Sequence, residues 1–272
     1  MSSEAQLTNW QNMNRISGVS KGILLLFSGL LFTAGSALSE ERARFRFCED
    51  PWAPYTLGEI GAAPEGGIAV ELFKELGKML DVDFQLTLLP WKRCLLWAET
   101  GDYDGVMLLT RNEERAAYLT FTNSVHQDKN LVWHRADRHF DHNFDRFADF
   151  QGVRIGVTAG FNYGERFNQA VDEFDLVVEE APNILSNLRR LDLGRIDVFL
   201  VNKPAAEFSM VEFPDLRERL TYAEGPFEAL PFYIGLSKAS PVTLKLDRFN
   251  QAITQMRDAG TLGKIFSAQP VP

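Results

Sequence analysis

Residues 101–107 read GDYDGVM, and residues 194–200 read GRIDVFL. Each stretch places an aspartate three residues after a glycine and then continues into apolar residues. A glycine just past a helix supplies the left-handed backbone that ends it, and the apolar run that follows indicates a buried strand. The chain therefore repeats one helix–strand junction, which predicts two lobes that are built alike.

Strands and helices alternate around both junctions. The expected elements of the first lobe are strands at 45–48, 83–89 and 104–109, a helix after Gly67 and a helix over 91–100. Those of the second lobe are strands at 152–157, 176–179 and 197–200, with helices from 163 and over 183–193. A strand over 230–236 and a helix over 242–260 return to the first lobe, and helical spacing turns Met79 and Leu244 toward the core. This alternation predicts an α/β protein with mostly parallel sheets covered by helices.

The composition limits the class of protein. The chain has 272 residues, of which 45% are hydrophobic, and a formal net charge of −9. The hydrophobic share is too high for a disordered polymer. The negative charge argues against a nucleic-acid partner, because such binding neutralises phosphates with Lys and Arg. Two cysteines are too few for a disulfide-dense small fold or a four-cysteine zinc site.

The N-terminal segment has the pattern of a secretory signal peptide. Arg15 and Lys21 precede an apolar run over 22–34, and small residues follow it. The run is shorter than the about 20 residues that a membrane-spanning helix needs. We therefore interpret residues 1–37 as a cleaved signal peptide and the mature protein as periplasmic. Cleavage after Ser39 and an uncleaved anchor are the alternatives.

Export determines how the two cysteines are interpreted. In an oxidising compartment a pair such as Cys48 and Cys94 is usually bonded, and the bridge would remove about 4 kcal/mol of unfolded-state entropy on the chain model. A reactive thiol is the alternative, but no histidine nearby has an activating arrangement. We expect a structural disulfide.

The chain resembles the bacterial solute-binding proteins of family 3, the polar amino acid type that serves ABC transporters, over residues 43–268. The resemblance rests on the order and spacing of short motifs: PWAPY at 51–55, Gly66-Gly67, Gly101-x-x-Asp104-Gly105, Thr110, Arg115, LTFT at 119–122, Gly156 to Gly160, GRID at 194–197, and Gly260. It implies a type II periplasmic binding fold with lobe one from 40–126 and 225–268, lobe two from 127–224, and crossing segments near 125–131 and 224–227. It also implies a monomer without a cofactor, which captures a small-molecule solute and presents it to an inner-membrane ABC permease.

The resemblance places a ligand site. Arg115 would grip the carboxylate of the solute with its planar fork of donors, and Thr110 would add its hydroxyl and N–H. Without the resemblance, Arg115 would be a solvated charge in the polar run 111–115. In lobe two, the turn at Gly160 and Phe161 precedes a helix, so its N–H groups would face an anion. An ordinary strand-to-helix turn is the alternative.

Three aromatic residues are expected at the wall of the cleft. Trp52, Tyr55 and Trp91 lie in loops or at a helix start beyond strand ends. There they could stack on a ligand, including a cation, or they could belong to the core.

One position departs from the family pattern. Members that bind α-amino acids usually have an aspartate where this chain has Asn202. The ammonium of a standard α-amino acid would lose that partner, unless Glu49 or Asp50 replaces it. We therefore expect a carboxylate-bearing solute, either an amino acid or a related compound.

Three other functions are alternatives. The fold also resembles periplasmic cyclohexadienyl dehydratases, and an enzyme could use Glu49, Asp50, Glu65 or His126, although no two of them form a recognisable pair. A metal site could use His134, His139 and His142 with Asp137, Asp141 and Asp145, but their spacing matches no compact zinc motif. The third alternative is a carrier that presents its solute to a sensory receptor. We favour binding without catalysis.

Overall fold

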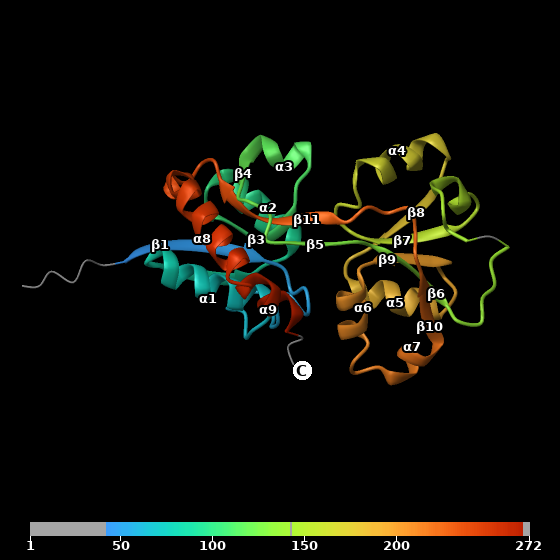
Figure 1. The fold of residues 1–272 in the computed structure, drawn as a ribbon. Coiled ribbons are helices and arrows are strands. Elements are labelled where there is room, and N and C mark those ends of the chain that lie inside the picture. Colours follow the sequence, from blue (N-terminus) through green and yellow to red (C-terminus); the bar gives the residue numbers. More distant parts are fainter. Residues whose placement is uncertain (1–41, 142, 269–272) are drawn as a thin grey trace, which may run out of the picture. The chain divides into compact units, whose positions relative to one another are not determined.

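The computed structural model describes residues 42–141 and 143–268, so the interpreted signal peptide lies outside the described residues. Two sheets, each flanked by helices, form two lobes (Figure 1). The chain passes from the first lobe to the second between Asp128 and Leu131, and it returns between Ala223 and Leu230. In the described part of the chain, every helix is too short or too polar to cross a bilayer.

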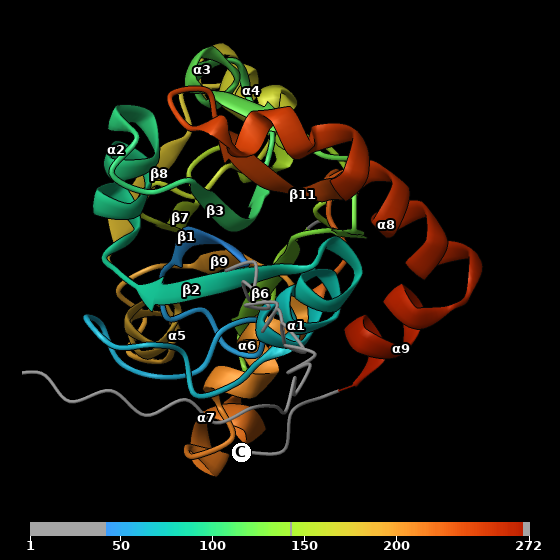
Figure 2. The ribbon, with the colours of Figure 1, turned by 90° about the vertical axis from the view of Figure 1, so that its left-hand side faces the viewer.

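The first lobe is built around a six-stranded sheet. Its strands are β1 (Ala43–Glu49), β2 (Val82–Leu88), β3 (Gly105–Thr110), β4 (Leu119–Phe121), β5 (His126–Asp128) and β11 (Leu230–Ser237). Its helices are α1 (Ile68–Leu80), α2 (Trp91–Thr100), α3 (Glu113–Tyr118), η2 (Pro241–Lys245), α8 (Leu246–Asp258) and α9 (Thr261–Ser267). Helix α2 lies on one side of this sheet, and α1 and α8 lie on the other (Figure 2). Alternate side chains of β1 face these two layers, because Phe47 packs on Phe73 of α1 and on Phe249 of α8, whereas Cys48 is bonded to Cys94 of α2.

The second lobe is built around a five-stranded sheet. Its strands are β6 (Leu131–Arg135), β7 (Arg154–Thr158), β8 (Val177–Ala181), β9 (Val198–Val201) and β10 (Leu220–Ala223). Its helices are η1 (Phe147–Phe150), α4 (Glu165–Glu173), α5 (Ile184–Asp192), α6 (Lys203–Ser209) and α7 (Pro214–Arg219). Helices α5, α6 and α7 cover one face of the sheet, and α4 covers the other (Figure 1).

The two sheets share one plan. The strand order is β2-β1-β3-β11-β4 in the first and β8-β7-β9-β6-β10 in the second. In each sheet the first three strands are parallel, and the fourth is an antiparallel strand next to a crossing segment. Both sheets are therefore mixed, and their parallel parts are those that the strand–helix alternation predicts.

The repeated junction makes the same hydrogen bonds in both lobes. The Asp104 N–H donates to Arg46 O at 2.8 Å, and the Asp104 carboxylate accepts the Arg46 N–H at 2.6 Å. The Asp197 N–H donates to Arg154 O at 2.8 Å, and its carboxylate accepts the Arg154 N–H at 2.9 Å. Each aspartate thus pairs both backbone groups of one residue on the neighbouring strand. The glycines before them are left-handed, as predicted.

Two side chains that were expected in the core lie at the surface. Met79 is 39% exposed and Leu244 is 88% exposed. Leu244 belongs to the 3₁₀ turn η2 rather than to α8, and three residues per turn change the face on which a side chain lies. Met79 lies beside the buried stripe of α1 that Leu76 and Leu80 define.

The expected disulfide is present. Cys48 and Cys94 are bonded with an S–S distance of 2.05 Å, and both residues are fully buried. The bridge attaches α2 to the end of β1. It therefore fixes the start of α2 beside Glu49, the last residue of β1.

Candidate functional site

A pocket lies between the lobes, where the carboxyl ends of β1, β3, β7 and β9 meet. Open α/β sheets place their ligands at this edge. From the first lobe it is lined by Glu49, Asp50, Trp52, Trp91, Leu108, Leu109, Thr110, Arg115, Leu230 and Phe232; from the first crossing by Asp128, Lys129 and Asn130; and from the second lobe by Phe161, Asn162, Tyr163, Val201 and Asn202. The pocket thus brings cations, carboxylates and aromatic rings within reach of one small molecule.

Arg115 is buried in the wall of this pocket. Asn112 caps α3 by accepting the Arg115 N–H at 2.9 Å, which fixes the position of the arginine on the helix. Arg115 is 4% exposed, and this burial lowers its pKa. Its guanidinium donates to Thr110 O at 2.8 Å, to Thr110 Oγ1 at 3.1 Å and to Gly160 O at 3.0 Å. These acceptors are uncharged, and a guanidinium has five N–H groups, so donors remain for an anion.

Gly160, in the turn that follows β7 of the second lobe, contacts Arg115 of the first lobe. Its carbonyl accepts from Arg115 and also from Trp91 Nε1, at 2.9 Å. Its φ is 77°, and a Cβ there would lie 2.9 Å from Trp91 Cδ1, so both the backbone and the close contact require glycine. Of the N–H groups expected to face an anion, that of Phe161 donates instead to Thr158 O at 3.1 Å. The group of this turn that contacts the first lobe is the Gly160 carbonyl. Helix α4 begins only after Gly164, so the turn lies before the helix and is not its first turn.

Asn162 makes a second contact between the lobes. Its side-chain N–H donates to Thr110 Oγ1 at 3.0 Å and to Arg111 O at 3.3 Å. Its Oδ1 accepts the Gly164 N–H at 3.1 Å, just before α4. The two lobes are therefore in contact through the turn that follows β7.

Trp52, Phe161 and Phe232 form an aromatic wall. The ring centroid of Trp52 lies 5.5 Å from that of Phe232 and 5.8 Å from that of Phe161. Trp52 is 7% exposed, and its indole N–H has no acceptor among the described residues. Tyr55 lies behind Trp52, with 4.1 Å between the ring centroids, and its hydroxyl donates to Asp128 Oδ2 at 3.2 Å. Tyr55 therefore positions a pocket carboxylate and is not itself part of the lining.

Glu49 and Asp50 bring two carboxyl groups to the same pocket. Glu49 is 1% exposed; its Oε2 accepts the Leu108 N–H at 2.9 Å, and its Oε1 accepts the Asp50 N–H at 3.3 Å. Burial, followed by the neighbouring Asp50 charge, raises the pKa of Glu49 well above its ordinary value. Burial also raises the pKa of Asp50 to about 6. The two groups therefore titrate as a pair that retains a proton more readily than separate carboxyls do.

Asn202 lies across the pocket at the end of β9. Its Oδ1 caps α6 by accepting the Ala205 N–H at 2.9 Å. Burial and the Asp128 charge raise the pKa of the Tyr55 hydroxyl, whereas a hydrogen bond with Asn202 lowers it. Asn202, Tyr55 and Asp128 therefore form a chain of contacts between the second lobe and β5.

Most of the expected ligand residues meet in this pocket. Trp52, Trp91, Thr110, Arg115, Phe161 and Asn202 line it, and Tyr55 and Gly160 lie directly behind the lining. Sequence reasoning missed Asp128 and Phe232. Asp128 belongs to a strand of three residues, which is too short to show a periodicity. Its position where the chain leaves the first lobe is the signal that could have found it.

The residues considered for other chemistry are dispersed. Glu65 is exposed, and His126 stacks on Phe266 with 4.3 Å between the ring centroids, outside the pocket lining. Within 42–141 and 143–268, no group of three or more His, Cys, Asp or Glu residues could hold a metal ion. His142 lies outside the described residues.

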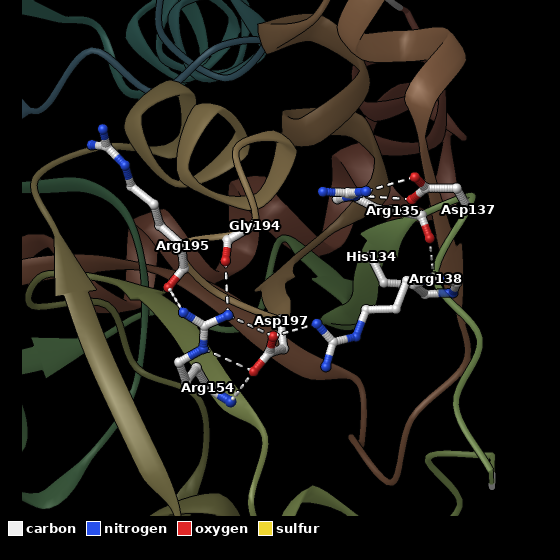
Figure 3. A network of polar contacts seen from close by, with 8 residues as sticks. All are labelled: His134, Arg135, Asp137, Arg138, Arg154, Gly194, Arg195 and Asp197. Carbon is white, nitrogen blue, oxygen red and sulfur yellow. Dashed lines mark hydrogen bonds and ion pairs between the residues drawn. The ribbon is translucent and has the colours of Figure 1, made fainter.

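Asp137, one of the residues considered for a metal, pairs instead with an arginine (Figure 3). Nearby, Asp197 accepts from Arg154 Nη2 at 2.8 Å and from Arg138 Nη1 at 2.5 Å. Arg154 also donates to Gly194 O and to the carbonyl of residue 195, each at 2.7 Å. This network joins the residues just before β9 to the amino end of β7, which is the second copy of the repeated junction. None of its residues lines the pocket.

Two α/β lobes joined by two crossings, with a buried arginine in the pocket between them, define a two-lobed ligand-binding protein. Residues 48–268 match the bacterial extracellular solute-binding proteins, family 3. The chain belongs to this family, which confirms the resemblance seen in the sequence.

Several known proteins are similar to this chain in sequence or in structure. The arginine-binding extracellular protein ArtP of Bacillus subtilis (strain 168) is 22% identical over 200 residues, which cover 73% of this chain and 75% of ArtP. An ancestral arginine-binding protein bound to arginine has a TM-score of 0.70 and 18% identity, over 85% of this chain and 99% of that one. A histidine kinase sensor domain with similarity to periplasmic binding proteins has a TM-score of 0.71 and 18% identity, over 85% and 96% of the two chains. These structural matches establish the fold.

Proposed function

We propose that this protein captures a small carboxylate-bearing solute, an amino acid or a related compound, between its lobes and delivers it to an ABC-type permease. The observation that carries the proposal is the guanidinium of Arg115, which is 4% exposed and bound only to uncharged oxygens in the described part of the chain. Burial lowers the pKa of Arg115 and outweighs the nearby acidic groups Glu49 and Glu114, which act to raise it. Taking a charge out of water costs several kcal/mol. A ligand carboxylate that pairs with Arg115 recovers much of that cost.

The pocket offers further groups to such a ligand. The indole N–H of Trp52 lacks an acceptor, and leaving a buried donor unsatisfied costs about 1–3 kcal/mol. The rings of Trp52, Phe161 and Phe232 supply apolar walls. The pocket therefore suits a molecule with one anionic end and a compact body.

Capture needs no bond to be broken. In an open form the solute docks on Arg115 and Thr110 of the first lobe, and the second lobe then closes over it, bringing Gly160 and Asn162 into contact. Residues 1–37 would direct export through a cleaved signal peptide, in accord with the extracellular location of the family. The closed form is the species that a permease would recognise.

A thermal-shift screen tests the binding step. Amino acids, organic acids, amines and short peptides are added to the mature protein, because a ligand that binds only the native form raises its melting temperature. Arg115→Ala should abolish the response to any carboxylate found in this way. The matched control is Arg111→Ala, since Arg111 is exposed and outside the pocket.

The melting temperature of unliganded Arg115→Ala should stay near that of the wild type, because the variant loses hydrogen bonds but also a buried charge. A folded Arg115→Ala protein that binds as tightly as Arg111→Ala would refute the role of Arg115. Delivery is tested separately: deletion of the gene should reduce cellular uptake of the radiolabelled solute, and undiminished uptake would argue against a transport role.

A second candidate function is suggested by the Glu49–Asp50 pair. Its raised pKa values would let one carboxyl act as a general acid near neutral pH. Product analysis by NMR of each binding compound after long incubation distinguishes the two functions. Unchanged ligand supports a carrier, and turnover that Glu49→Gln abolishes supports an enzyme.

A further inference from the structure

Three carboxyl groups line the same pocket as Arg115, and they differ in the hydrogen bonds that they accept from the protein. Glu49 is 1% exposed, and each of its oxygens accepts a backbone N–H, from Leu108 and from Asp50. Asp50 follows Glu49 directly, and burial raises the pKa of both groups, so the two carboxyls resist carrying two negative charges at once. This pair is therefore poorly suited to neutralise a cation.

Asp128 is held differently. Its Oδ2 accepts the Tyr55 hydroxyl at 3.2 Å, and its Oδ1 accepts the Lys129 N–H at 2.8 Å, so both donors are uncharged groups. The side chain of Lys129 is exposed and pairs with Glu224 at 2.5 Å. Burial raises the pKa of Asp128, and the hydrogen bonds from the Lys129 N–H and the Tyr55 hydroxyl oppose that shift by favouring the charged form. Burial lowers the pKa of His126, two residues earlier, which disfavours a charge on this ring. Asp128 thus presents a half-buried carboxylate to the pocket with lone pairs still available.

The surroundings of Asp128 hold it in place. Tyr55 is 1% exposed and packs against Trp52, with 4.1 Å between the ring centroids, so its hydroxyl has little freedom to move. Asn202 approaches the same hydroxyl from the second lobe, but its amide carries no charge. On closure, a ligand between the lobes therefore meets the fixed carboxylate of Asp128 at β5 and the guanidinium of Arg115.

We propose that Asp128 is the anionic partner of a positively charged group on the ligand, so that the solute carries a protonated amine or guanidinium in addition to its carboxylate. This inference rests on the proposed function, because it uses the carboxylate end at Arg115 to orient the ligand. The specificity for charge then depends on the crossing segment, while the two lobes supply the walls.

Calorimetric titration with matched pairs of compounds tests the assignment. L-Arginine, L-glutamine and L-glutamate are each compared with the same molecule lacking the α-ammonium. L-Arginine is also compared with L-citrulline, whose side chain is uncharged. In the wild type, a compound that lacks the positive charge paired with Asp128 should bind about 10- to 100-fold more weakly, as expected for a charge-assisted hydrogen bond. This loss of affinity is the penalty compared among the variants. In Asp128→Asn that penalty should disappear.

Three further variants make the test specific. Asp50→Asn should keep the wild-type penalty, and so should the matched control Asp172→Asn, an exposed position on α4. Asp128→Asn combined with Asn202→Asp should restore the penalty, because it returns a carboxylate to the other side of the Tyr55 hydroxyl. Melting curves confirm that each variant folds.

Two results would overturn the inference. One is a penalty that persists in Asp128→Asn but disappears in Asp50→Asn. The other is a wild-type protein that binds, through Arg115, only carboxylates without a positive charge; that outcome would leave the proposed function standing. Failure of every compound to bind would refute the proposed function and the inference together.

Discussion

Replacing Gly160 by alanine should weaken ligand binding in addition to destabilising the fold. Gly160 has a φ of 77°, and a Cβ there would lie 2.9 Å from Trp91 Cδ1 on the opposite lobe. The left-handed backbone costs an alanine about 1–2 kcal/mol, and this cost is present whether the lobes are open or closed. The steric contact exists only in the closed form, where overpacking adds about 1–3 kcal/mol. Ligand affinity should therefore fall by about 5- to 150-fold.

Gly152→Ala is the matched control. Gly152 has a φ of 73°, and an added Cβ would meet nothing within 4 Å. Urea titrations should show the same loss of unfolding free energy in both variants, whereas calorimetry with the solute found by screening should show weakened binding in Gly160→Ala alone. Equal affinities in the two variants would refute the conclusion that closure brings Gly160 onto Trp91.

Three other predictions concern stability. Replacing Cys48 and Cys94 together by alanine should lower the free energy of unfolding by about 4 kcal/mol, because the bridge joins residues 46 apart; an unchanged urea midpoint would contradict this. Asp197→Asn should cost about 2 kcal/mol through its weakened bonds to Arg154, with ligand affinity unchanged, and calorimetry showing lost binding would connect this network to the pocket. The pKa of Asp50 is raised from 3.8 to about 6, so between these values the folded protein keeps a proton that the unfolded chain releases. The free energy of unfolding should therefore fall as the pH rises from about 4 to about 6. Urea titrations of Asp50→Asn over this range should show a smaller slope, and a wild-type slope would assign the proton elsewhere.

Local signals were sufficient to predict much of the fold. Helix α2 has the predicted bounds of 91–100 because Pro90 stops the preceding strand and Gly101 takes the left-handed conformation that ends the helix. The aspartates at 104 and 197 were recognisable from their spacing after glycine. Their reciprocal bonds to Arg46 and Arg154 required the structure, because they join strands that lie far apart in the sequence.

The site was less predictable because its geometry is tertiary. Arg115 was expected from a family resemblance, but its contact with Gly160 depends on how closely the lobes approach. The N–H groups of that turn were expected to face an anion, but the N–H of Phe161 is bound within the turn to Thr158 O. Asp128 was missed because a three-residue strand has no period and its partner Tyr55 is distant in sequence. The contacts that select a ligand were thus harder to predict than the elements that carry them.

The strand order of the first sheet has a consequence for biosynthesis. β11, which begins at Leu230, lies between β3 and β4, which are completed by Phe121. A nascent chain that has not reached β11 has a gap in the middle of this sheet, whereas the strands of the second lobe, all between Leu131 and Ala223, are already translated. The second lobe can therefore form first. The pocket can be assembled only after nearly the whole chain has been synthesised, so a fragment truncated before β11 should never trap solute.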